Sequence, residues 1–297
     1  MNRFFVIVNP AAGRGRARQE WPGQAAALRD AGVSFEVAET REPGEAVGLA
    51  ERAAREVDVV VAAGGDGTVH EVANGLLRAG GNAALGVLPL GSGNDFVKML
   101  PPRDAMERLV HGTARPFDAG RIVAGATRYF ANGMDIGFGA HASRNLTKVP
   151  RFLTGLGAYL GALVLTLVRY PRLEVRLQLD DGPAFAQTTS MTAVMNGRSF
   201  GGSFHVCPDA QADDGQLDLL IAQGCGRLEI LGLVPRIMRG THGGDRRLRL
   251  ARARRVVIES QEPLLVGRTG RSPSRTRAAS TSRCCRARCA CSPDTAR

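Results

Sequence analysis

The chain has 297 residues, 44% of them hydrophobic, and a formal net charge of +11. This length and composition are typical of a globular protein with one large or two modest cores, and they exclude a coiled coil and a collagen-like fibre. Residues 267–297 contain eight arginines and one aspartate, so this tail carries +7 and the rest of the chain only +4. A mildly basic body suits an anionic ligand or an anionic membrane surface, and we expect no nucleic-acid partner.

The N-terminus has five consecutive apolar residues, Phe4–Val8, before Asn9 and Pro10. A secretory signal needs a longer apolar stretch, so we expect no export. Outside the tail the chain has two cysteines, Cys207 and Cys225. This is the pattern expected of a cytoplasmic protein with reduced thiols.

In the first third of the chain, predicted strands alternate with predicted helices. The strands are expected at residues 4–8, 33–38, 57–62 and 84–88, and the helices up to about 31, at 45–56 and at 69–79. The alternation predicts an α/β domain with a parallel sheet over residues 1–120. Glycine-rich loops follow three of these strands, so we expect a ligand site at the carboxyl edge of the sheet.

After about Asp118 the sequence changes to short β-rich segments separated by turn residues, at 121–124, 127–131, 173–179, 190–195, 217–222 and 254–259. They predict a second, mostly antiparallel β-sandwich domain over residues 121–266. The longest uncharged run, Phe152–Val168, is at the short limit for a membrane span and contains three glycines. We expect a helix packed on the core. The alternative is a helix that contacts a membrane surface, with Arg151 and Arg169 at its ends.

The run Gly64–Thr68, with the sequence Gly-Gly-Asp-Gly-Thr, is the strongest local signal. Glycines let the backbone approach phosphate oxygens, and the following helix N-terminus adds partial positive charge. Asn9–Gly13, with Arg14 and Arg16 behind it, and Gly91–Asp95 are the other two loops. A tight turn explains any one of these loops, but three at one sheet edge favour a phosphate-bearing ligand. Neither a Walker A motif nor a GxGxxG fingerprint is present.

Together, Asn9–Gly13, Gly64–Thr68 and Leu90–Phe96 resemble the three signatures of the diacylglycerol kinase-like family, which includes soluble bacterial lipid kinases and sphingosine kinases. The resemblance continues at Asn196-Gly197 and over residues 208–218. NAD kinases and phosphofructokinases share the Gly-Gly-Asp-Gly-Thr feature and the expected fold of the first domain, but not the downstream motifs. The resemblance implies an enzyme that transfers the γ-phosphate of ATP to a hydroxyl of a diacylglycerol-like lipid, with ATP bound between the two domains.

By matching position, the resemblance also implies site residues, with ATP and Mg²⁺ as cofactors. The acidic network around the phosphates would consist of Asp66, Asp95 and Asp118. The nucleotide would contact Asn9, Gly13, Arg14, Thr40, Gly64, Gly65, Asp66, Gly67, Thr68, Val69, His70, Gly91, Ser92 and Asn94. A magnesium ion in the second domain would be held by Asp214 and the backbone carbonyls near Gln211 and Gln216. A plain turn remains the alternative for Thr40, Asp118 and the loop at Asp214.

The C-terminus departs from the family. Family members carry an Asp-Gly-Glu whose carboxylates supply the catalytic base, followed by an apolar strand, whereas residues 267–297 contain no Leu, Ile, Val, Phe, Met, Trp or Tyr. We therefore expect a disordered, low-complexity tail there. We suggest a frameshift in the gene as the origin of this tail. When residues 267–293 are back-translated with GC-rich codons, one allowed translation in a neighbouring reading frame contains Asp-Gly-Glu. Sequencing the 3′ end of the gene tests this. Glu262 is the candidate substitute for the lost acid, and a nucleic-acid or membrane-binding arm is the alternative for the tail.

The leading hypothesis is an ATP-dependent lipid kinase that works peripherally at the inner face of the membrane, with activity impaired by the altered C-terminus. The first alternative is a catalytically inactive nucleotide-binding, membrane-associated protein of the same fold. The second is a related kinase that phosphorylates a soluble nucleotide or sugar. The sequence leaves open which lipid is used, and it leaves open the oligomeric state, a dimer included.

Overall fold

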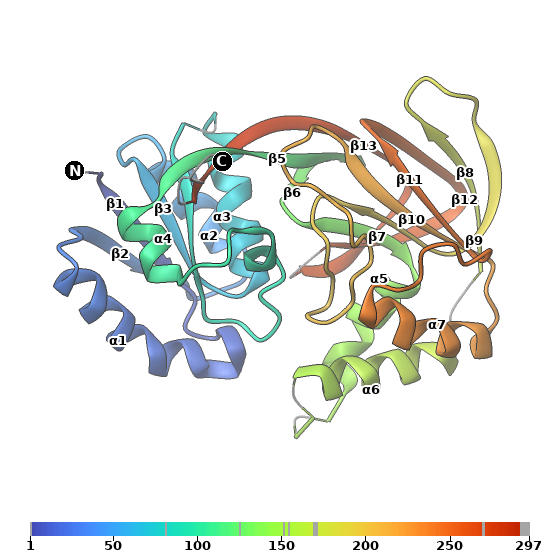
Figure 1. Cartoon of the computed structure of the whole chain (residues 1–297), viewed down its shortest axis with the longest axis horizontal. Helices are drawn as coiled ribbons and strands as arrows, with labels where there is room; N and C mark the ends of the chain where they lie inside the picture. The colour runs from blue at the N-terminus through green and yellow to red at the C-terminus, as the bar shows by residue number, and fades with distance from the viewer. Residues whose placement is uncertain are drawn as a thin grey trace. The chain divides into compact units, whose positions relative to one another are not determined.

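The computed structural model describes residues 2–80, 82–124, 126–150, 152–153, 155–168, 172–268 and 271–291. The chain forms two compact units (Figure 1): unit 1 comprises Met1–Ala119 and Cys285–Arg297, and unit 2 comprises Gly120–Cys284. The sequence analysis set the corresponding division between residues 120 and 121.

Unit 1 contains a parallel sheet, as the sequence predicted, and its strand order is β2-β1-β3-β4. Its strands are β1 (Phe4–Val8), β2 (Phe35–Glu39), β3 (Val59–Gly64) and β4 (Ala84–Pro89). Strands β2 and β3 pair with opposite edges of β1, so the chain reverses its direction across the sheet after β2. The carboxyl ends of β1 and β3 therefore form the switch point at which doubly wound sheets bind their ligands.

Helices flank this sheet (Figure 1), namely α1 (Arg16–Asp30), α2 (Glu45–Ala53), α3 (Asp66–Arg78) and α4 (Ala105–His111), with short 3₁₀ turns η1 (Ala12–Gly15) and η2 (Phe96–Met99) in the loops. β3 is buried along its whole length, which explains its continuous apolar sequence. Helix α2 approaches α3 closely at Gly75, where an added Cβ would lie 2.4 Å from the carbonyl oxygen of Val47. Helix α3 begins at Asp66, three residues before the predicted start, so the glycine motif itself forms its first turn.

Unit 2 is built on antiparallel strands, which confirms the predicted class. The strands are β5 (Thr113–Ala124), β6 (Ala126–Phe130), β7 (Gly133–Gly137), β8 (Leu173–Leu179), β9 (Phe185–Met195), β10 (Leu217–Gln223), β11 (Leu248–Ala253) and β12 (Arg255–Arg268). The order β11-β10-β9-β7-β12 forms one run, and β8 pairs with both β9 and β12. A core of β-branched and aromatic side chains, including Phe130, Ile136 and Val256, lies on one face of these strands.

The other face of β9 and β10 is covered by helices. Within β10, Leu219 and Ile221 face the strand core, whereas Leu220 and Ala222 face the helices. The covering helices are α5 (Phe138–Asn145), η3 (Leu146–Lys148), α6 (Gly155–Val168) and α7 (Arg227–Arg239). Only α6 was expected from the sequence. In the part of the chain that the structure describes, no helix is long and apolar enough to cross a membrane.

The tail differs from the expectation of disorder, because the backbone of Arg271–Cys291 forms strand β13. This strand pairs antiparallel with β12 and, at Arg288 and Cys289, parallel with β4. Strand pairing uses the backbone N–H and C=O groups that every residue except proline carries in full, so a segment without large apolar side chains can still extend a sheet.

Candidate functional site

The three glycine-containing loops of unit 1 meet at the carboxyl edge of its sheet. The side-chain amide of Asn9, after β1, donates to the hydroxyl of Thr68, in the first turn of α3, over 3.1 Å. Gly13 packs against β4, since a Cβ there would lie 2.7 Å from the carbonyl oxygen of Leu90. Gly65 and Gly91 are in backbone contact, and a Cβ on Gly91 would lie 2.3 Å from the Cα of Gly65. The sequence placed these loops at one edge, and the structure brings them into direct contact there.

Side chains fix the conformation of the third loop. The amide of Asn94 closes the loop on Gly91, accepting from its N–H over 3.1 Å and donating to its carbonyl over 3.0 Å. Asn94 has a φ of 50°, in the left-handed region that asparagine tolerates better than most residues. The guanidinium of Arg16 donates to the carbonyl oxygen of Gly91 over 2.7 Å. Arg16 therefore links the start of α1 to this loop.

The first loop has the backbone of an anion-binding turn. Gly13, Arg14 and Gly15 have φ values of 61°, 62° and 92°, so three consecutive residues lie in the left-handed region. Such turns orient successive backbone N–H groups toward a common point. Glycine has no steric penalty there, whereas Arg14 carries a Cβ and is a strained position of the kind that occurs at functional loops.

Two of the three predicted carboxylates lie side by side. Asp66, at the first position of α3, accepts from the N–H of Phe96 over 3.1 Å. Burial, followed by the negative charge of Asp95, raises the pKa of Asp66 to about 6. Asp95 is 1% exposed and forms an ion pair with Lys98 over 2.7 Å. The pair thus forms an acidic centre next to the glycine loops, with Asp95 buried and Asp66 half-buried, which is chemistry suited to orienting a cation or accepting a proton.

Asp118, the third predicted carboxylate, lies in β5 and is 2% exposed. Its neighbour Phe117 stacks on Phe96, with ring centroids 5.0 Å apart. Because Phe96 directly follows Asp95, this aromatic contact connects the strand that carries Asp118 to the loop that carries Asp95.

The remaining predicted nucleotide contacts divide into two groups. Thr40 follows β2, and its N–H donates to the carbonyl of Val8 over 2.8 Å, which places it at the same sheet edge; Ser92 is exposed at the tip of its loop. Val69 and His70, in contrast, are only 3% and 6% exposed. The side-chain nitrogens of His70 and Asn74 lie 3.4 Å apart within the helix. The buried side chains of Val69 and His70 thus pack α3 against its neighbours. The partly exposed residues of the motif are those at the start of the helix, Asp66 and Gly67.

An arginine of β11 reaches the predicted magnesium loop of unit 2. Asp214 accepts from the N–H of Gln216 over 2.9 Å, and its other oxygen forms an ion pair with Arg252. The Nε atom of Arg252 also lies 3.2 Å from Asp218, and Gln211 is exposed. Among the described residues no three His, Cys, Asp or Glu side chains form a metal-binding group. The guanidinium bridges the two carboxylates, and its single positive charge offsets one of their two negative charges. The magnesium site at Gln211, Asp214 and Gln216 stays a prediction.

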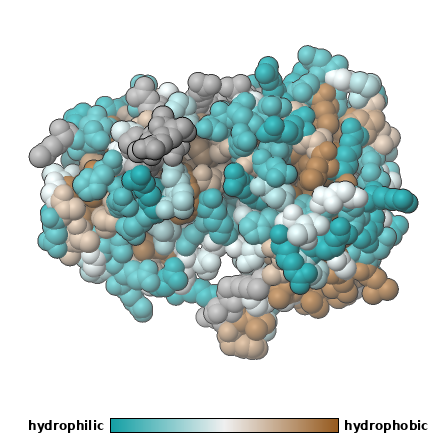
Figure 2. All heavy atoms as spheres, viewed as in Figure 1, coloured by the Kyte–Doolittle hydropathy of each residue, from teal (hydrophilic) through white to brown (hydrophobic). Residues whose placement is uncertain are grey.

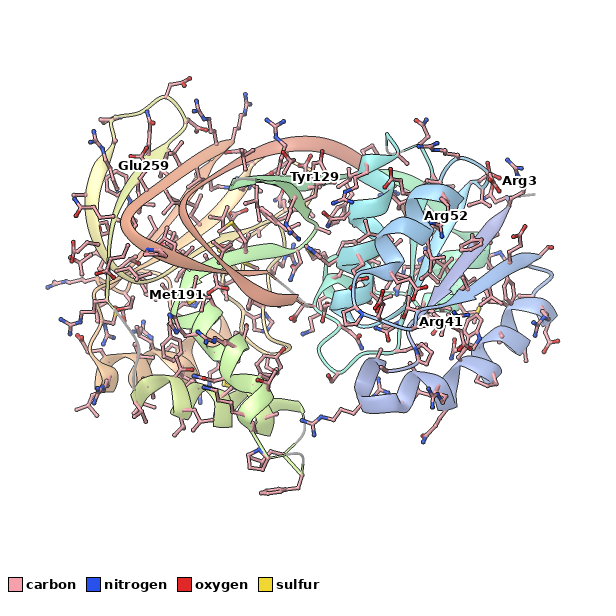
Figure 3. All side chains as sticks on the ribbon, turned by 180° about the vertical axis from the view of Figure 1, so that it is seen from behind. Arg3, Arg41, Arg52, Tyr129, Met191 and Glu259 are labelled. Carbon is pink, nitrogen blue, oxygen red and sulfur yellow. The ribbon has the colours of Figure 1, made fainter. Side chains whose placement is uncertain are left out.

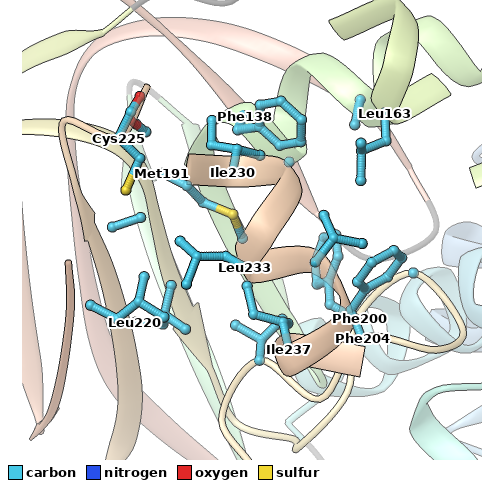
Figure 4. Close-up of a pocket in the computed structure, with 18 of the residues that line it drawn as sticks. Phe138, Leu163, Met191, Phe200, Phe204, Leu220, Cys225, Ile230, Leu233 and Ile237 are labelled. Carbon is cyan, nitrogen blue, oxygen red and sulfur yellow. The ribbon is translucent and has the colours of Figure 1, made fainter. Parts of the chain in front are cut away.

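Unit 2 contains an apolar pocket that the sequence did not predict. Its volume is about 110 Å³, and it lies between the helices and the outer face of β9 to β11. Figure 4 shows Leu233 of α7 between the helix and Leu220 of β10, with Ile230 beside Phe138. Met191, labelled in Figure 3, lies near α5 and also lines the pocket. The other walls come from α5, α6 and the loop after β9, and include Phe138, Tyr159, Leu163, Phe200 and Phe204.

A buried acid lies beside this pocket. Asp135 in β7 is 0% exposed, and among the described residues no side chain is hydrogen-bonded to its carboxylate oxygens. Burial raises its pKa to about 7, against a smaller lowering by the backbone N–H of Ala140. Two glycines make room for the carboxyl group, because a Cβ on Gly139 or on Gly267 would lie 2.4 Å from one of its oxygens. Gly139 also lines the pocket. The sequence signal for this acid is a single charge within the apolar run of β7.

Glu262, the candidate substitute for the lost Asp-Gly-Glu, lies in β12 and is exposed. It borders a surface groove with Arg172, Glu174, Arg176 and Glu259, and it does not line the apolar pocket. Its exposed side chain borders this groove in the described structure, and Glu262 as the substitute acid stays a prediction.

Two family models match the chain. The model for the diacylglycerol kinase catalytic domain matches residues 3–122, which contain all three glycine loops. The model for the YegS C-terminal NAD kinase beta sandwich-like domain matches residues 136–283. The two matches cover both units of the structure.

Individual proteins are similar over nearly the whole chain. A diacylglycerol kinase of Bacillus subtilis is 30% identical over 279 residues, covering 91% of this chain and 90% of that protein. A YegS-like lipid kinase of Pseudomonas aeruginosa is 32% identical over 265 residues, covering 87% and 85%. A crystal structure of a diacylglycerol kinase from Bacillus anthracis superposes with a TM-score of 0.70 at 22% identity, covering 99% of this chain and 98% of the other. At that identity the structural likeness concerns the fold.

Proposed function

Because this chain belongs to the family of diacylglycerol kinases and YegS-like lipid kinases, we propose that it transfers the γ-phosphate of ATP to a hydroxyl group of a diacylglycerol-like lipid. The observation that carries the proposal is the direct contact of three glycine loops at the switch point of a doubly wound sheet. The donor side of the reaction is assigned to unit 1. The acceptor side requires an apolar site for acyl chains, and unit 2 offers one.

In unit 1, the phosphates would be bound mainly by backbone groups. The first N–H groups of a helix lack intrahelical acceptors, so Asp66 and Gly67 in the first turn of α3 can donate to an anion, whereas the N–H of Thr68 donates to the carbonyl of Gly65 over 2.9 Å. The left-handed turn at Gly13 and Arg14 adds further N–H groups. Asn9, Thr40, Ser92 and the Asn94 loop surround this edge and would orient the nucleotide.

Asp66 and Asp95 are the residues that would hold the magnesium ion accompanying the nucleotide. Asp66 and Asp95 supply carboxylate oxygens, the ligands that Mg²⁺ prefers, and their mutual repulsion makes a cation favourable there. Bound to the phosphates, the ion would neutralise charge that develops during phosphoryl transfer. Asp66 and Asp95 would then hold the nucleotide's counter-ion in position, with Asp118 as a further carboxylate of this region. The Asp214 loop of unit 2 is bridged by Arg252, and we assign it no role in the reaction.

The apolar pocket of unit 2 would receive part of an acyl chain. Its described walls are mainly aliphatic, aromatic and sulfur-containing side chains, with Ser143 and Ser190 among them, and burial of methylene groups there stabilises binding by about 0.8 kcal/mol per CH₂. Such a substrate resides in a bilayer, so the enzyme would work peripherally at the inner face of the membrane. A soluble nucleotide or sugar would gain nothing from this pocket, which argues against that acceptor class.

The test is transfer of labelled γ-phosphate from ATP to a bacterial lipid extract in the presence of magnesium, beside a set of soluble alcohols and nucleosides. We expect label in the lipid fraction alone, and its loss in Asp66→Asn. Label in a soluble acceptor alone would contradict the proposal.

A second function is favoured by one specific observation, the missing Asp-Gly-Glu together with the exposed position of Glu262. A protein that binds nucleotide and lipid without catalysing transfer would keep the binding residues and lack the catalytic base in this way. The chain as given and a version with the Asp-Gly-Glu register restored separate the two cases. Equal labelling of lipid by both chains excludes the hypothesis of a catalytically inactive protein. Labelling by the restored chain alone supports that hypothesis for the unmodified chain.

A further inference from the structure

Exposed apolar side chains are concentrated in one part of unit 2. Ten large apolar side chains are exposed in the described part of the chain, and seven of them lie on α6, on α7 or just before α6. Figure 2 shows the corresponding hydrophobic surface over α6 and α7. Such clustering on a protein surface marks a site of interaction with another apolar surface. We call it the α6–α7 face, made of Phe152, Leu160, Val164, Leu165, Val168, Leu228 and Leu231.

The α6–α7 face is the outer side of helices whose inner side lines the pocket. Leu160, Val164 and Val168 recur every four residues and form one exposed stripe on α6. Tyr159 and Leu163 of the same helix line the pocket. On α7, likewise, Ile230 and Leu233 line the pocket while Leu228 and Leu231 are exposed. Both helices are therefore apolar on two sides, and only the inner side is covered by protein in the described structure.

The exposed side chains of α6 and of α7 meet where the end of α6 lies beside the start of α7. The guanidinium of Arg227, the first residue of α7, donates to the carbonyl oxygen of Val168, the last residue of α6, over 3.0 Å. This hydrogen bond brings the exposed side chain of Val168 to the start of α7, where Leu228 is 82% exposed. The exposed apolar side chains of α6 and α7 therefore come together at this junction, beside the guanidinium of Arg227.

Positive charge borders this surface. Arg172 lies at the start of α7, with its guanidinium 3.8 Å from the position of a Cβ on Gly226, and Arg227 lies beside it. At the other end of α6, the exposed Lys148 follows Leu146, which packs against Ala158 and Ala162 of that helix. Helix α6 itself has no charged residue. The acid nearest the junction, Glu229, is held by the N–H of Gly226 over 2.6 Å.

From these observations we propose that the α6–α7 face docks on the surface of an anionic lipid bilayer, with its leucine and valine side chains in the acyl-chain boundary and Lys148, Arg172 and Arg227 among the headgroups. An apolar stripe with basic edges is the pattern of helices that lie in a membrane interface. Helix α6 has 14 residues, which is about 21 Å of helix, against about 30 Å of hydrocarbon core, so it would lie along the surface and not span it. In a two-fold dimer each copy would bring its own Lys148, Arg172 and Arg227 to the interface, and the uncharged helix α6 supplies no acid to pair with them.

This docking rests on the proposed function for its biological purpose, because it would place the walls of the pocket at the membrane that contains the substrate. Binding to vesicles needs neither ATP nor turnover, however. A failure of the docking proposal is therefore distinguishable from a failure of the proposed kinase activity.

The test is flotation of the full chain with phosphatidylcholine vesicles and with vesicles in which half of that lipid is replaced by phosphatidylglycerol, without nucleotide. We expect binding to the anionic vesicles, weakened by salt, and at least tenfold weaker binding for Val164→Asp and for Leu228→Asp. The matched control is Val37→Asp, because Val37 is 48% exposed on β2 of unit 1, and it should bind like the unmodified chain. Arg227→Gln should lower binding by about fivefold, as expected for one basic residue at an anionic surface.

Unchanged flotation of both α6–α7 variants, or no flotation of the unmodified chain, would overturn the proposal. A third outcome would do so as well: a dimer in solution that Val164→Asp dissociates, with vesicle binding unaffected, would show that a second copy covers this face. Circular dichroism and the thermal midpoint verify that the variants are folded, which their exposed positions favour. Phosphorylation of water-soluble dihexanoylglycerol is the separate test of catalysis, and its absence would leave the vesicle result standing.

Discussion

Gly65 and Gly91 are in backbone contact, although they belong to loops that follow different strands: an added Cβ would lie 3.1 Å from the neighbouring glycine's Cα in one direction and 2.3 Å in the other. Neither position has room for a side chain. The contact fixes the distance between the start of α3 and the third loop, and both of these elements carry groups assigned to phosphate binding.

Gly91→Ala should therefore disrupt the site and lower stability. Backbone in contact with backbone has little freedom to move, so we expect destabilisation of about 3 kcal/mol, at the upper end for overpacking, and loss of measurable ATP binding. Thermal unfolding and calorimetric titration with ATP check this. Gly23→Ala is the matched control, since nothing lies within 4 Å of a Cβ there. It should leave ATP binding unchanged and stabilise α1 by about 0.5–1 kcal/mol.

Binding of magnesium and ATP should depend on the protonation of Asp66. Burial and the charge of Asp95 raise its pKa to about 6, and only the ionised carboxylate is a good magnesium ligand. The affinity for ATP with magnesium should therefore rise between pH 5 and pH 7, with a midpoint of about 6. Calorimetric titrations across this range measure it.

Two variants show whether Asp66 is the group responsible for that pH dependence of ATP binding. Asp66→Asn should remove the midpoint and weaken binding at neutral pH, whereas Asp30→Asn, on the exposed end of α1, should change neither. An unchanged midpoint in Asp66→Asn would assign the titration to another group.

The sequence predicted the parallel sheet and the positions of the glycine loops because both depend on local signals. A continuous apolar run such as β3 indicates a strand covered on two faces, and the loops follow from glycines at strand ends. Strand β8 occupies the predicted range, Leu173–Leu179. The contact between Gly65 and Gly91 is not visible in the sequence, because it depends on the order in which the strands pair.

Other elements were missed for physical reasons. Helix α7 contains Gly232 and Pro235, which weaken any helical prediction, and its ends depend on Glu229 capping the first turn and on Gly240 in the left-handed conformation. The pocket arises from α5, α6 and α7 converging on one sheet face, so no local pattern indicates it. Asp135 was overlooked because a single acid in a strand is usually assigned to a solvated face, whereas the glycines that accommodate it are distant in sequence or on the next helix.

Asp135 should make the stability of the protein depend on pH. Burial raises the pKa of its carboxyl from 3.8 to about 7, so the folded state binds the proton more tightly than the unfolded state does. The contribution is therefore fully present below pH 3.8 and is lost as the pH rises to about 7. At 1.36 kcal/mol per pKa unit, the loss is about 4 kcal/mol.

Asp135→Asn should remove this dependence, so that it is more stable than the unmodified chain at pH 8 by a larger margin than at pH 5. Thermal midpoints at the two pH values measure the difference. Asp181→Asn, at an exposed position, is the control and should parallel the unmodified chain. A parallel response of Asp135→Asn would mean that the carboxyl group is stabilised as an anion.

A narrower pocket should bind acyl chains less well. Ala142 lines the pocket from α5 and is partly exposed, so a phenylalanine there can fill the space without overpacking the core. We expect the dissociation constant of a fluorescent acyl-chain probe to rise about tenfold, the effect of losing roughly two buried methylene groups. Ala186→Phe, exposed on β9 and outside the pocket, should leave the constant unchanged. Equal binding by both variants would place the acyl chain elsewhere.

The central claim is that this chain has the framework of a kinase for a diacylglycerol-like lipid. The most direct measurement is mass spectrometry of the products formed from ATP, magnesium, diacylglycerol vesicles and soluble alcohols by the chain with its Asp-Gly-Glu register restored. We predict one new product, diacylglycerol phosphorylated on its free hydroxyl, formed in larger amount by the restored chain than by the chain as given. Phosphorylation of a soluble acceptor with diacylglycerol untouched, or no phosphorylated product from either chain, would contradict the account.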